Sequence, residues 1–349
     1  MNEIKRVLAV ETSCDDTSVA IVESGGRVLT QVSANQDLEH APYGGIVPEI
    51  ASRNHSISLL PLIQHTLNKT SLDWSQINGL AVTNRPGLIG SLIVGIMTLK
   101  SIAQAFQIPL IGVNHLEGHL LAPFLNDETY SPPSDFNYPY IALAVSGGHS
   151  SIYWVKSFSD YVVIGSSRDD AAGEAFDKFA KMVGLGYPGG AKVDNCSKLG
   201  NKEKFAFPRS LISEDNLMMS FSGLKSSAKR LLEKMPPDEI ESERNHLCAS
   251  FQEAIVDVLV AKCLKATARF NCKKLVITGG VSANSRLRER MLELAPAYQI
   301  VIPPLRYCTD NAAMIGYTGI LRLNRGEKND LSLGPSSQLY ESDFSYDLQ

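Results

Sequence analysis

The sequence lacks the features that mark several common classes of protein. None of its six cysteines forms a Cys-x-x-Cys pair, so neither a zinc ribbon nor a disulfide scaffold is indicated, and free thiols in a reducing compartment are expected. The net charge is -4, from 33 basic and 37 acidic residues, so no global positive field draws the chain to nucleic acid or to an anionic membrane. Any contact with RNA must therefore come from a local patch or through a partner.

Long apolar runs and leader-like segments are missing as well. The longest apolar stretch, residues 88–99, contains Gly90 and Gly95 and stops at Lys100. A membrane span needs about 20 apolar residues, so we expect a buried helix there. Residues 1–6 are mixed in charge, and the apolar run that follows is too short for a signal peptide. These absences predict a cytoplasmic protein with no membrane segment.

Short apolar runs alternate with segments of helical spacing, which predicts an α/β fold. Strands are expected at 6–10, 18–22, 28–32, 80–83, 110–113, 140–145, 151–155, 161–164 and 274–278. Helices are expected at 48–67, 87–106, 171–183, 245–268, 281–294 and 311–323. A glycine and proline turn is expected at 186–190, and the tail after Gly334 is expected to be poorly structured.

Two segments of the chain share one pattern of strand, small polar turn and strand. These are residues 7–23 (VLAVETSCDDTSVAIVE) and 141–155 (IALAVSGGHSSIYWV). The pattern indicates either two copies of one unit, which would face each other across a cleft, or a chance agreement, because many strand pairs share this period. The proline-containing segment 126–139 is the expected boundary. It predicts domains at 1–125 and 126–349, with the last helix and tail either in the second domain or packed back on the first.

Two histidines stand four residues apart, at His115 and His119. If Asn114 opens a helix, both imidazoles lie on one face and can bind one metal ion; two exposed helix histidines are the alternative. The segment differs from the zinc-protease pattern HExxH. Glu117 lies two residues from each histidine, about 200° round a helix, and so points away from a metal that they share.

Asp310 precedes the closing helix and can complete a site of two histidines and one carboxylate, which leaves coordination positions open for substrate. The alternative is that Asp310 caps the helix, and one carboxylate can serve both purposes. The positions of Asn284 and Asp177, taken alone, likewise suggest structural roles only. Asn284 would cap a helix, and Asp177 would lie at the surface of another.

Three turns of small residues follow apolar strands, at 12–16, 146–149 and 279–282. Backbone N–H groups in such turns can hold phosphate oxygens, although none of the three has P-loop or Rossmann spacing. One such turn alone would be explained by conformational preference. Three in one α/β chain favour nucleotide binding.

Together these segments resemble the TsaD family, known also as Kae and Gcp proteins, of tRNA threonylcarbamoyladenosine synthases. The similarity runs from Arg6 to about Leu323. The segments that carry it are 10–17, 44–49, 86–88, 115–119, 145–149, 173–178, 187–190, 221–225, 279–284 and 308–311. The resemblance implies an actin-like ATPase (ASKHA) fold, in which two RNase H-like lobes flank a nucleotide cleft. It also implies transfer of a threonylcarbamoyl group from threonylcarbamoyl-AMP to N6 of the adenosine 3′ of the tRNA anticodon.

The resemblance further implies roles for particular residues. His115, His119 and Asp310 match ligands of one divalent metal ion, iron(II) in the first place and zinc(II) in the second. Asp15 matches a catalytic carboxylate. The positions that match contacts to substrate or to a bound nucleotide (ATP, ADP or threonylcarbamoyl-AMP) are Ala144, Val145, Ser146, Gly147, Gly148, Asp177, Gly190, Asp194 and Asn284.

The family also implies partners. They are the tRNA substrate, a TsaB-like paralogue, a TsaE-like ATPase and a TsaC-type synthase that supplies threonylcarbamoyl-AMP; a homodimer is the alternative arrangement. Two other functions stay open, a metallo-endopeptidase, which is the family's old description, and a non-catalytic nucleotide-binding scaffold. One departure from the family pattern is Asn84-Arg85 before Pro86. Arg85 would contact tRNA phosphate or lie at the surface.

Overall fold

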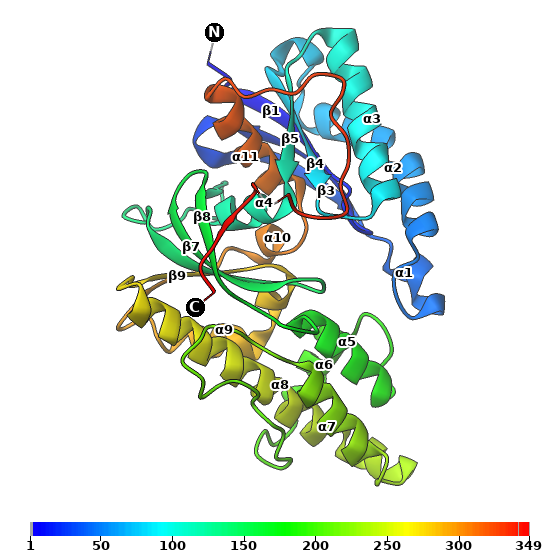
Figure 1. Cartoon of the computed structure of the whole chain (residues 1–349). Coiled ribbons are helices and arrows are strands. Elements are labelled where there is room, and N and C mark those ends of the chain that lie inside the picture. The colour runs from blue at the N-terminus through cyan, green and yellow to red at the C-terminus, as the bar shows by residue number, and fades with distance from the viewer. Residues whose placement is uncertain (1–2, 341, 349) are drawn as a thin grey trace. The chain divides into compact units, whose positions relative to one another are not determined.

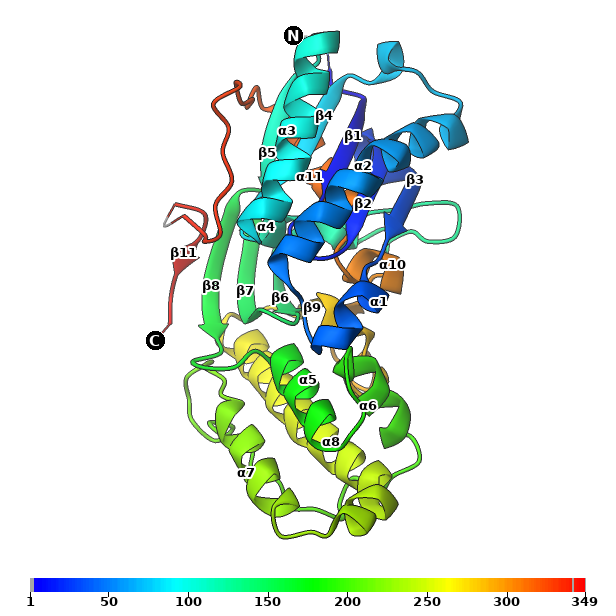
Figure 2. The same cartoon turned by 90° about the vertical axis from the view of Figure 1, so that its right-hand side faces the viewer.

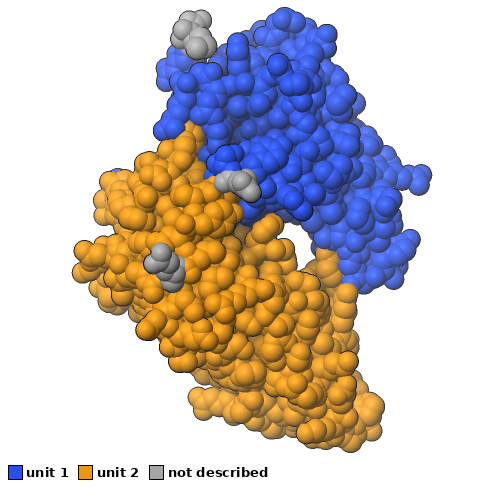
Figure 3. Space-filling view, in the orientation of Figure 1, with its two compact units in different colours: residues 1–134, 303–343 blue, residues 135–302, 344–349 orange. Residues whose placement is uncertain are grey.

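The computed structural model describes residues 3–340 and 342–348, which form two compact units (Figures 1 and 3). The first unit comprises Met1–Ser134 and Pro303–Asp343, and the second comprises Asp135–Ile302 and Phe344–Gln349. The first boundary lies at residue 134 and not at the expected residue 125. Of the two expected places for the closing helix the structure has the second, since the helix packs back on the first unit through its apolar face.

The first unit is built on a sheet with the strand order β3-β2-β1-β4-β5. Its β1 pairs antiparallel with β2 and parallel with β4, β2 pairs antiparallel with β3, and β4 pairs parallel with β5. The strands are β1 (Arg6–Glu11), β2 (Thr17–Glu23), β3 (Arg27–Ala34), β4 (Gly79–Arg85) and β5 (Leu110–Asn114). The helices are α1 (Asp37–His40), α2 (Pro48–Thr70), α3 (Ile89–Phe106), α4 (His115–Leu121), α10 (Leu305–Cys308) and α11 (Ala312–Asn324).

Alternate residues of β1 supply two hydrophobic layers, because successive strand side chains point to opposite faces. Leu8 and Val10 belong to the layer beneath α2 and α3, whereas Val7 and Ala9 belong to the layer beneath α11. Figure 2 shows α2 and α3 side by side over the sheet. A Cβ at Gly316 would lie only 2.8 Å from a methyl of Val22, so glycine lets α11 approach β2 closely. The sheet is thus covered on both faces, as its parallel strands require.

The second unit repeats this strand arrangement, in the order β10-β9-β6-β7-β8-β11. Here β6 pairs antiparallel with β7 and parallel with β9, just as β1 pairs with β2 and β4. The shared order confirms that the two similar segments are copies of one RNase H-like unit. The strands are β6 (Tyr140–Val145), β7 (Ser150–Ser157), β8 (Asp160–Ser166), β9 (Lys274–Thr278), β10 (Gln299–Val301) and β11 (Ser345–Tyr346). The helices are α5 (Ala172–Met182), α6 (Gly189–Ser197), α7 (Ser222–Leu232), α8 (Pro237–Arg269) and α9 (Ser285–Leu292).

Several helix boundaries in the second unit differ from the expected ones. Helix α8 begins at Pro237 rather than at Asn245, since a proline fits the first helical turn. Helix α6 begins inside the expected turn, and α7 was not predicted. The helix expected from Val281 begins at Ser285, after a short 3-10 turn.

The C-terminal tail is ordered by contacts with both units, so the expectation of a poorly structured tail is wrong. In the first unit, Asp343 accepts hydrogen bonds of 2.9 and 2.8 Å from Arg85 Nε, and the Arg85 guanidinium lies over the ring of Tyr340. In the second unit, Phe344 is buried against Tyr153. Strand β11 then pairs with β8, at the edge of the sheet that Figure 2 shows.

Helix α3 is long and apolar enough to cross a membrane by length and composition alone, and a third of that stretch is buried. Its buried residues, which include Leu92, Ile96 and Leu99, belong to the core layer that it shares with α2. Ile93 and Met97 are exposed on the other side. The expected buried helix is therefore buried along one face only.

Candidate active site

The site in the first unit begins with α4, whose start is set by Asn114. The Asn114 side chain accepts hydrogen bonds from the backbone N–H groups of Leu116 and Glu117, as a helix N-cap does. Because His115 and His119 then stand one turn apart, their rings meet edge to face with centroids 4.7 Å apart. Both side chains are buried, so the alternative of two exposed helix histidines is wrong.

Asp310 joins the two histidines although 191 residues separate it from His119. Its Oδ1 lies 3.3 Å from His115 Nε2 and 3.2 Å from His119 Nε2. The capping of α11 falls to Asn311, whose side chain accepts a hydrogen bond from the Met314 N–H. The Asp310 carboxylate is therefore not the cap that position alone suggested.

Glu11 contacts the cluster, although its place in the sequence predicted no role for it. Its Oε2 lies 2.9 Å from His115 Nδ1 and accepts a hydrogen bond of 2.5 Å from Thr83, while its Oε1 accepts one from the Ser13 N–H. Glu11 is fully buried at the end of an apolar strand. One feature of the sequence could have indicated a role for Glu11. It follows four apolar residues directly, and an acid at the end of a buried strand needs partners for its charge.

The charges of this cluster shift the pKa values of its members. Burial favours the neutral forms, but the neighbouring charges outweigh it: Asp310 and Glu11 hold the pKa of His115 well above its usual value. Burial likewise opposes ionisation of Asp310, yet His115 and His119 hold the pKa of Asp310 well below its usual value. The carboxylate of Asp310 is thus available as an anionic ligand.

The donor atoms suit a metal ion. One ligand atom from each of His115, His119 and Asp310 lies within 4.8 Å of the others. Glu11 fixes His115 through Nδ1, so that Nε2 faces Asp310, which is the arrangement in which an outer carboxylate orients a metal-bound histidine. Two histidines and one carboxylate with open positions form the donor set of non-haem iron(II) sites and also suit zinc(II).

Asp15 and Asp16 lie beside this cluster, in the loop between β1 and β2. Burial raises the pKa of Asp15. Burial together with the charges of Asp15 and Asp310 raises the pKa of Asp16 to about 7. The loop therefore holds one carboxyl group, that of Asp16, that can gain or lose a proton near neutral pH.

Glu117 does not belong to the cluster. Its Oε2 accepts hydrogen bonds of 2.9 and 2.7 Å from Arg322 on α11, and its side chain is buried. The acid that a zinc protease would use on metal-bound water is here half of an ion pair with Arg322. The geometry thus argues against the metallo-endopeptidase, as the spacing predicted.

The remaining predicted residues lie in the second unit, where a series of contacts connects them. Ala144 and Val145 end β6, and Ser146, Gly147 and Gly148 form the turn after it. A Cβ at Gly147 or Gly148 would meet no described atom within 4 Å, so the backbone of this turn is open. The Gly173 N–H donates to the Ser146 carbonyl at 3.2 Å, which fixes the start of α5 against the turn.

Helices α5, α6 and α9 continue this series. Asp177 accepts a hydrogen bond of 2.8 Å from the Gly189 N–H at the start of α6, next to Gly190. Asp194 on α6 accepts hydrogen bonds from the N–H and hydroxyl of Ser285, at 3.2 and 2.8 Å. Asp177 thus connects two helices and is not the plain surface residue that its position suggested.

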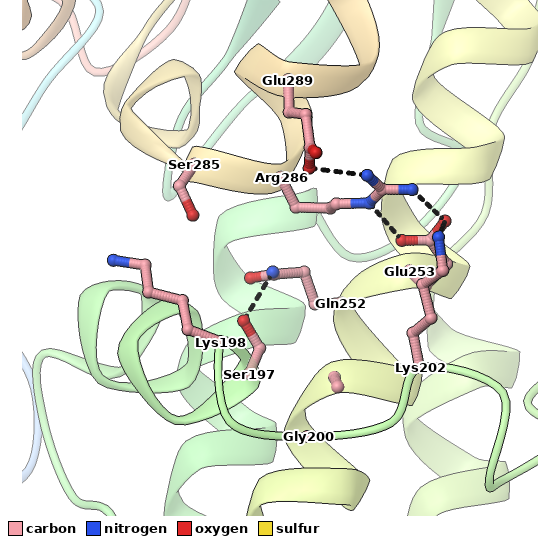
Figure 4. Close-up of a pocket in the computed structure, with 10 residues that line it drawn as sticks. Ser197, Lys198, Gly200, Lys202, Gln252, Glu253, Ser285, Arg286 and Glu289 are labelled. Carbon is pink, nitrogen blue, oxygen red and sulfur yellow. Dashed lines mark hydrogen bonds and ion pairs between the residues drawn. The ribbon is translucent and has the colours of Figure 1, made fainter.

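Asn284 serves as the N-cap of α9, and its amide donates to Gln252 at 2.6 Å. A pocket of about 230 Å³ lies beside it (Figure 4), lined by Gln252, Ser285 and Arg286 among others. Arg286 is paired with Glu253 and Glu289 there. Because its charges are paired, this pocket offers little net attraction to an anion.

Comparison with known proteins identifies the class of fold first. The chain matches HypF from T. kodakarensis with a TM-score of 0.60 at 12% identity, covering 95% of this chain and 49% of that one. It matches component A of the (R)-2-hydroxyglutaryl-CoA dehydratase of Acidaminococcus fermentans with a TM-score of 0.51 at 15% identity, covering 91% and 98%. At these identities the likeness concerns the fold alone. With its two RNase H-like units, the chain is a protein of the actin-like ATPase fold, as predicted.

Sequence comparison then identifies the family. Residues 27–317 match the model of TsaD, tRNA N6-adenosine threonylcarbamoyltransferase. A protein of that name from Bdellovibrio bacteriovorus is 62% identical over 343 residues, which cover 98% of this chain and 99% of the relative. One from Anaeromyxobacter dehalogenans (strain 2CP-C) is 46% identical over 339 residues, which cover 96% and 99%. The chain belongs to the TsaD family of transferases.

Proposed function

We propose that this protein transfers the threonylcarbamoyl group of threonylcarbamoyl-AMP to N6 of the adenosine 3′ of the tRNA anticodon. The observation that carries the proposal is the set of two buried histidines, His115 and His119, with the partly exposed carboxylate of Asp310, in a chain of this family. In the reaction, the adenine N6 attacks the carbamoyl carbon. A C–N bond forms, the C–O bond to the phosphate breaks, AMP leaves, and N6 loses one proton.

His115, His119 and Asp310 are proposed to hold one divalent metal ion, iron(II) by preference and zinc(II) as the alternative. When bound, such an ion acts as a Lewis acid toward carbonyl or carboxylate oxygen. The role of the protein is to hold the ligands in position. Glu11 orients the ring of His115, and the negative charge of Asp310 balances the charge of a cation.

We propose that Asp15 orients the adenine amine or accepts its proton. A carboxyl group whose pKa is raised by burial is a better base than a free aspartate, because the pKa of an efficient base lies near the working pH. An Asp15→Ala protein that keeps normal turnover would remove this role.

The nucleotide, whether ATP, ADP or the AMP portion of the substrate, is proposed to bind in the second unit. The open backbone of Gly147 and Gly148, in the turn that Ser146 begins, suits phosphate oxygens, and backbone N–H groups in such turns bind anions. The further contacts are assigned, by position in the family, to Ala144, Val145, Asp177, Gly190, Asp194 and Asn284.

A TsaB-like paralogue is proposed to dock on the outer face of α2 and α3. Ile57 and Leu60 on α2 and Ile93 and Met97 on α3 are exposed on these adjoining helices. Large apolar side chains exposed on two helices that pack together suit a protein interface. A Met97→Glu protein is expected to lose the complex in light-scattering chromatography, whereas a homodimer without any partner would contradict this assignment.

The TsaE-like ATPase, the TsaC-type synthase and the cytoplasmic location belong to the same proposal. A reducing compartment suits the six cysteines, which form no disulfide in the structure. To test the function, the protein is incubated with unmodified tRNA and threonylcarbamoyl-AMP, with and without the candidate partners, and nucleosides are quantified by mass spectrometry. N6-threonylcarbamoyladenosine is the expected product. Its absence in every combination, with folded and metal-loaded protein, would contradict the proposal.

A further inference from the structure

The loop that carries Asp15 is held at its first half by the start of α3. The Ser13 carbonyl accepts a hydrogen bond of 2.8 Å from the Leu88 N–H. The Thr12 hydroxyl donates to the Ser91 carbonyl at 3.0 Å. These contacts fix residues 12 and 13 but do not reach the peptide that joins Cys14 to Asp15.

That peptide is held from the other side, by His55 on α2. His55 is fully buried, and its Nε2 lies 2.9 Å from the Cys14 carbonyl oxygen. Its Nδ1 lies 2.7 Å from the hydroxyl of Thr17, where β2 begins, and that hydroxyl is also 3.0 Å from Ser58 Oγ. Both ring nitrogens therefore have partners, one at each end of the segment that contains Asp15 and Asp16.

The contacts fix the tautomer of the ring. A carbonyl oxygen can only accept, so Nε2 carries the proton and donates to Cys14. Nδ1 is then the acceptor for the Thr17 hydroxyl. Burial lowers the pKa of His55, which keeps the imidazole in this neutral form. The ring is thus held in one orientation, with Nε2 as the donor and Nδ1 as the acceptor.

We propose that His55 is a positioning residue for Asp15. The Cys14 carbonyl and the Asp15 N–H belong to one planar peptide unit. A hydrogen bond that fixes the carbonyl therefore fixes the plane from which the Asp15 side chain departs. His55 itself has no part in binding substrate. This inference rests on the proposed function of Asp15 and adds the residue that positions the Asp15 side chain.

The experiment compares His55→Ala with His65→Ala, since His65 is an exposed histidine on the same helix. In wild-type protein and both variants, hydrogen exchange of the amides of residues 14–17, kcat and KM for threonylcarbamoyl-AMP are measured. His55→Ala is expected to speed exchange in residues 14–17 and to lower kcat by about 10- to 100-fold, the cost of a small misplacement of a catalytic group. KM is expected to stay unchanged, because the proposed nucleotide contacts lie in the second unit.

A second pair of variants covers the case in which His55→Ala does not fold. Thr17→Ser keeps the hydroxyl that contacts His55 Nδ1 and is expected to behave as wild type. Thr17→Val removes that hydroxyl and is expected to speed exchange and lower kcat, but less than His55→Ala does. Unchanged exchange at residues 14–17 in a folded His55→Ala or Thr17→Val protein would overturn the inference. So would an equal loss of kcat in His65→Ala. If the wild-type protein makes no modified nucleoside, the proposed function fails, while the exchange data still decide whether His55 holds the loop.

Discussion

Replacing Glu11 by glutamine should weaken metal binding although Glu11 is not a metal ligand in the proposed site. Glutamine has the same shape, but its single carbonyl oxygen replaces only one of the two carboxylate oxygens, so it keeps the hydrogen bond from either Ser13 or Thr83. It cannot provide the negative charge that faces His115 Nδ1 at 2.9 Å. His115 then becomes a less basic and less firmly oriented ligand.

The expected size of the effect follows from this geometry. Loss of an outer partner of a metal-bound histidine typically lowers metal affinity by about 10- to 100-fold. That range corresponds to about 1.4–2.7 kcal/mol of binding free energy. We expect the upper part of the range, because Glu11 is fully buried and water cannot take its place beside the ring.

Anaerobic titration calorimetry of the metal-free protein with iron(II), and competition against a chelator with zinc(II), would measure the affinity. Glu117→Gln is the matched control, since it makes the same substitution at a buried acid on the helix that carries both histidines. Glu117 contacts Arg322 instead of His115, so its affinity should equal that of the wild type. Equal affinities of Glu11→Gln and the wild type, with both proteins folded, would refute the reasoning.

Three further predictions concern other contacts of the first unit. Arg322→Met should lower the free energy of unfolding by about 3–5 kcal/mol in urea titrations, because it removes the guanidinium charge that faces the buried carboxylate of Glu117; no loss would contradict the ion pair. Asp343→Asn should speed proteolysis and hydrogen exchange of residues 335–340 and 342–347 by about 10-fold or more, since it removes charged hydrogen bonds from Arg85; unchanged rates would show that these residues are held by other contacts. Asp16→Asn should stabilise the metal-free protein by about 1–2 kcal/mol at pH 8 and by less at pH 5, allowing for solvent screening. The stabilisation grows with pH because the folded-state pKa of Asp16 is about 7, so its ionisation destabilises the folded protein as the pH rises from about 4 to 7. A gain in melting temperature that does not depend on pH would contradict this prediction.

Local patterns were enough to predict the parts of the site that lie close together in sequence. His115 and His119 share a helix face because the helical period dictates it, and Asn114 caps that helix as its residue type suggests. The direction of Glu117 follows from the same geometry. The alternation of β1 and β6 and the turns after them predicted two similar units, and the strand order agrees.

Contacts between distant segments could not be derived in this way. The assignment of Asp310 to the site of the two histidines depended on the resemblance to a family, since the position of Asp310 alone also allowed a helix cap. The pairing of Arg85 with Asp343 spans 258 residues, and composition made the tail appear unstructured. Glu11 and His55 act through partners on other elements, so their roles emerged only when the sheet and α2 were in place. The change from four apolar residues to an acid marks Glu11 in the sequence but does not name its partners, and His55, among polar neighbours, has no such mark.

If this chain modifies tRNA through the cluster on α4 and Asp310, its two histidines must be needed for the product. The amount of N6-threonylcarbamoyladenosine that purified protein forms on unmodified tRNA from threonylcarbamoyl-AMP, with the required partners present, tests this. The double variant His115→Ala/His119→Ala is compared with wild type and with His65→Ala, the exposed-histidine control. We expect product with wild type and His65→Ala and none with the double variant. Equal product from a folded double variant would show that the cluster is not the active site.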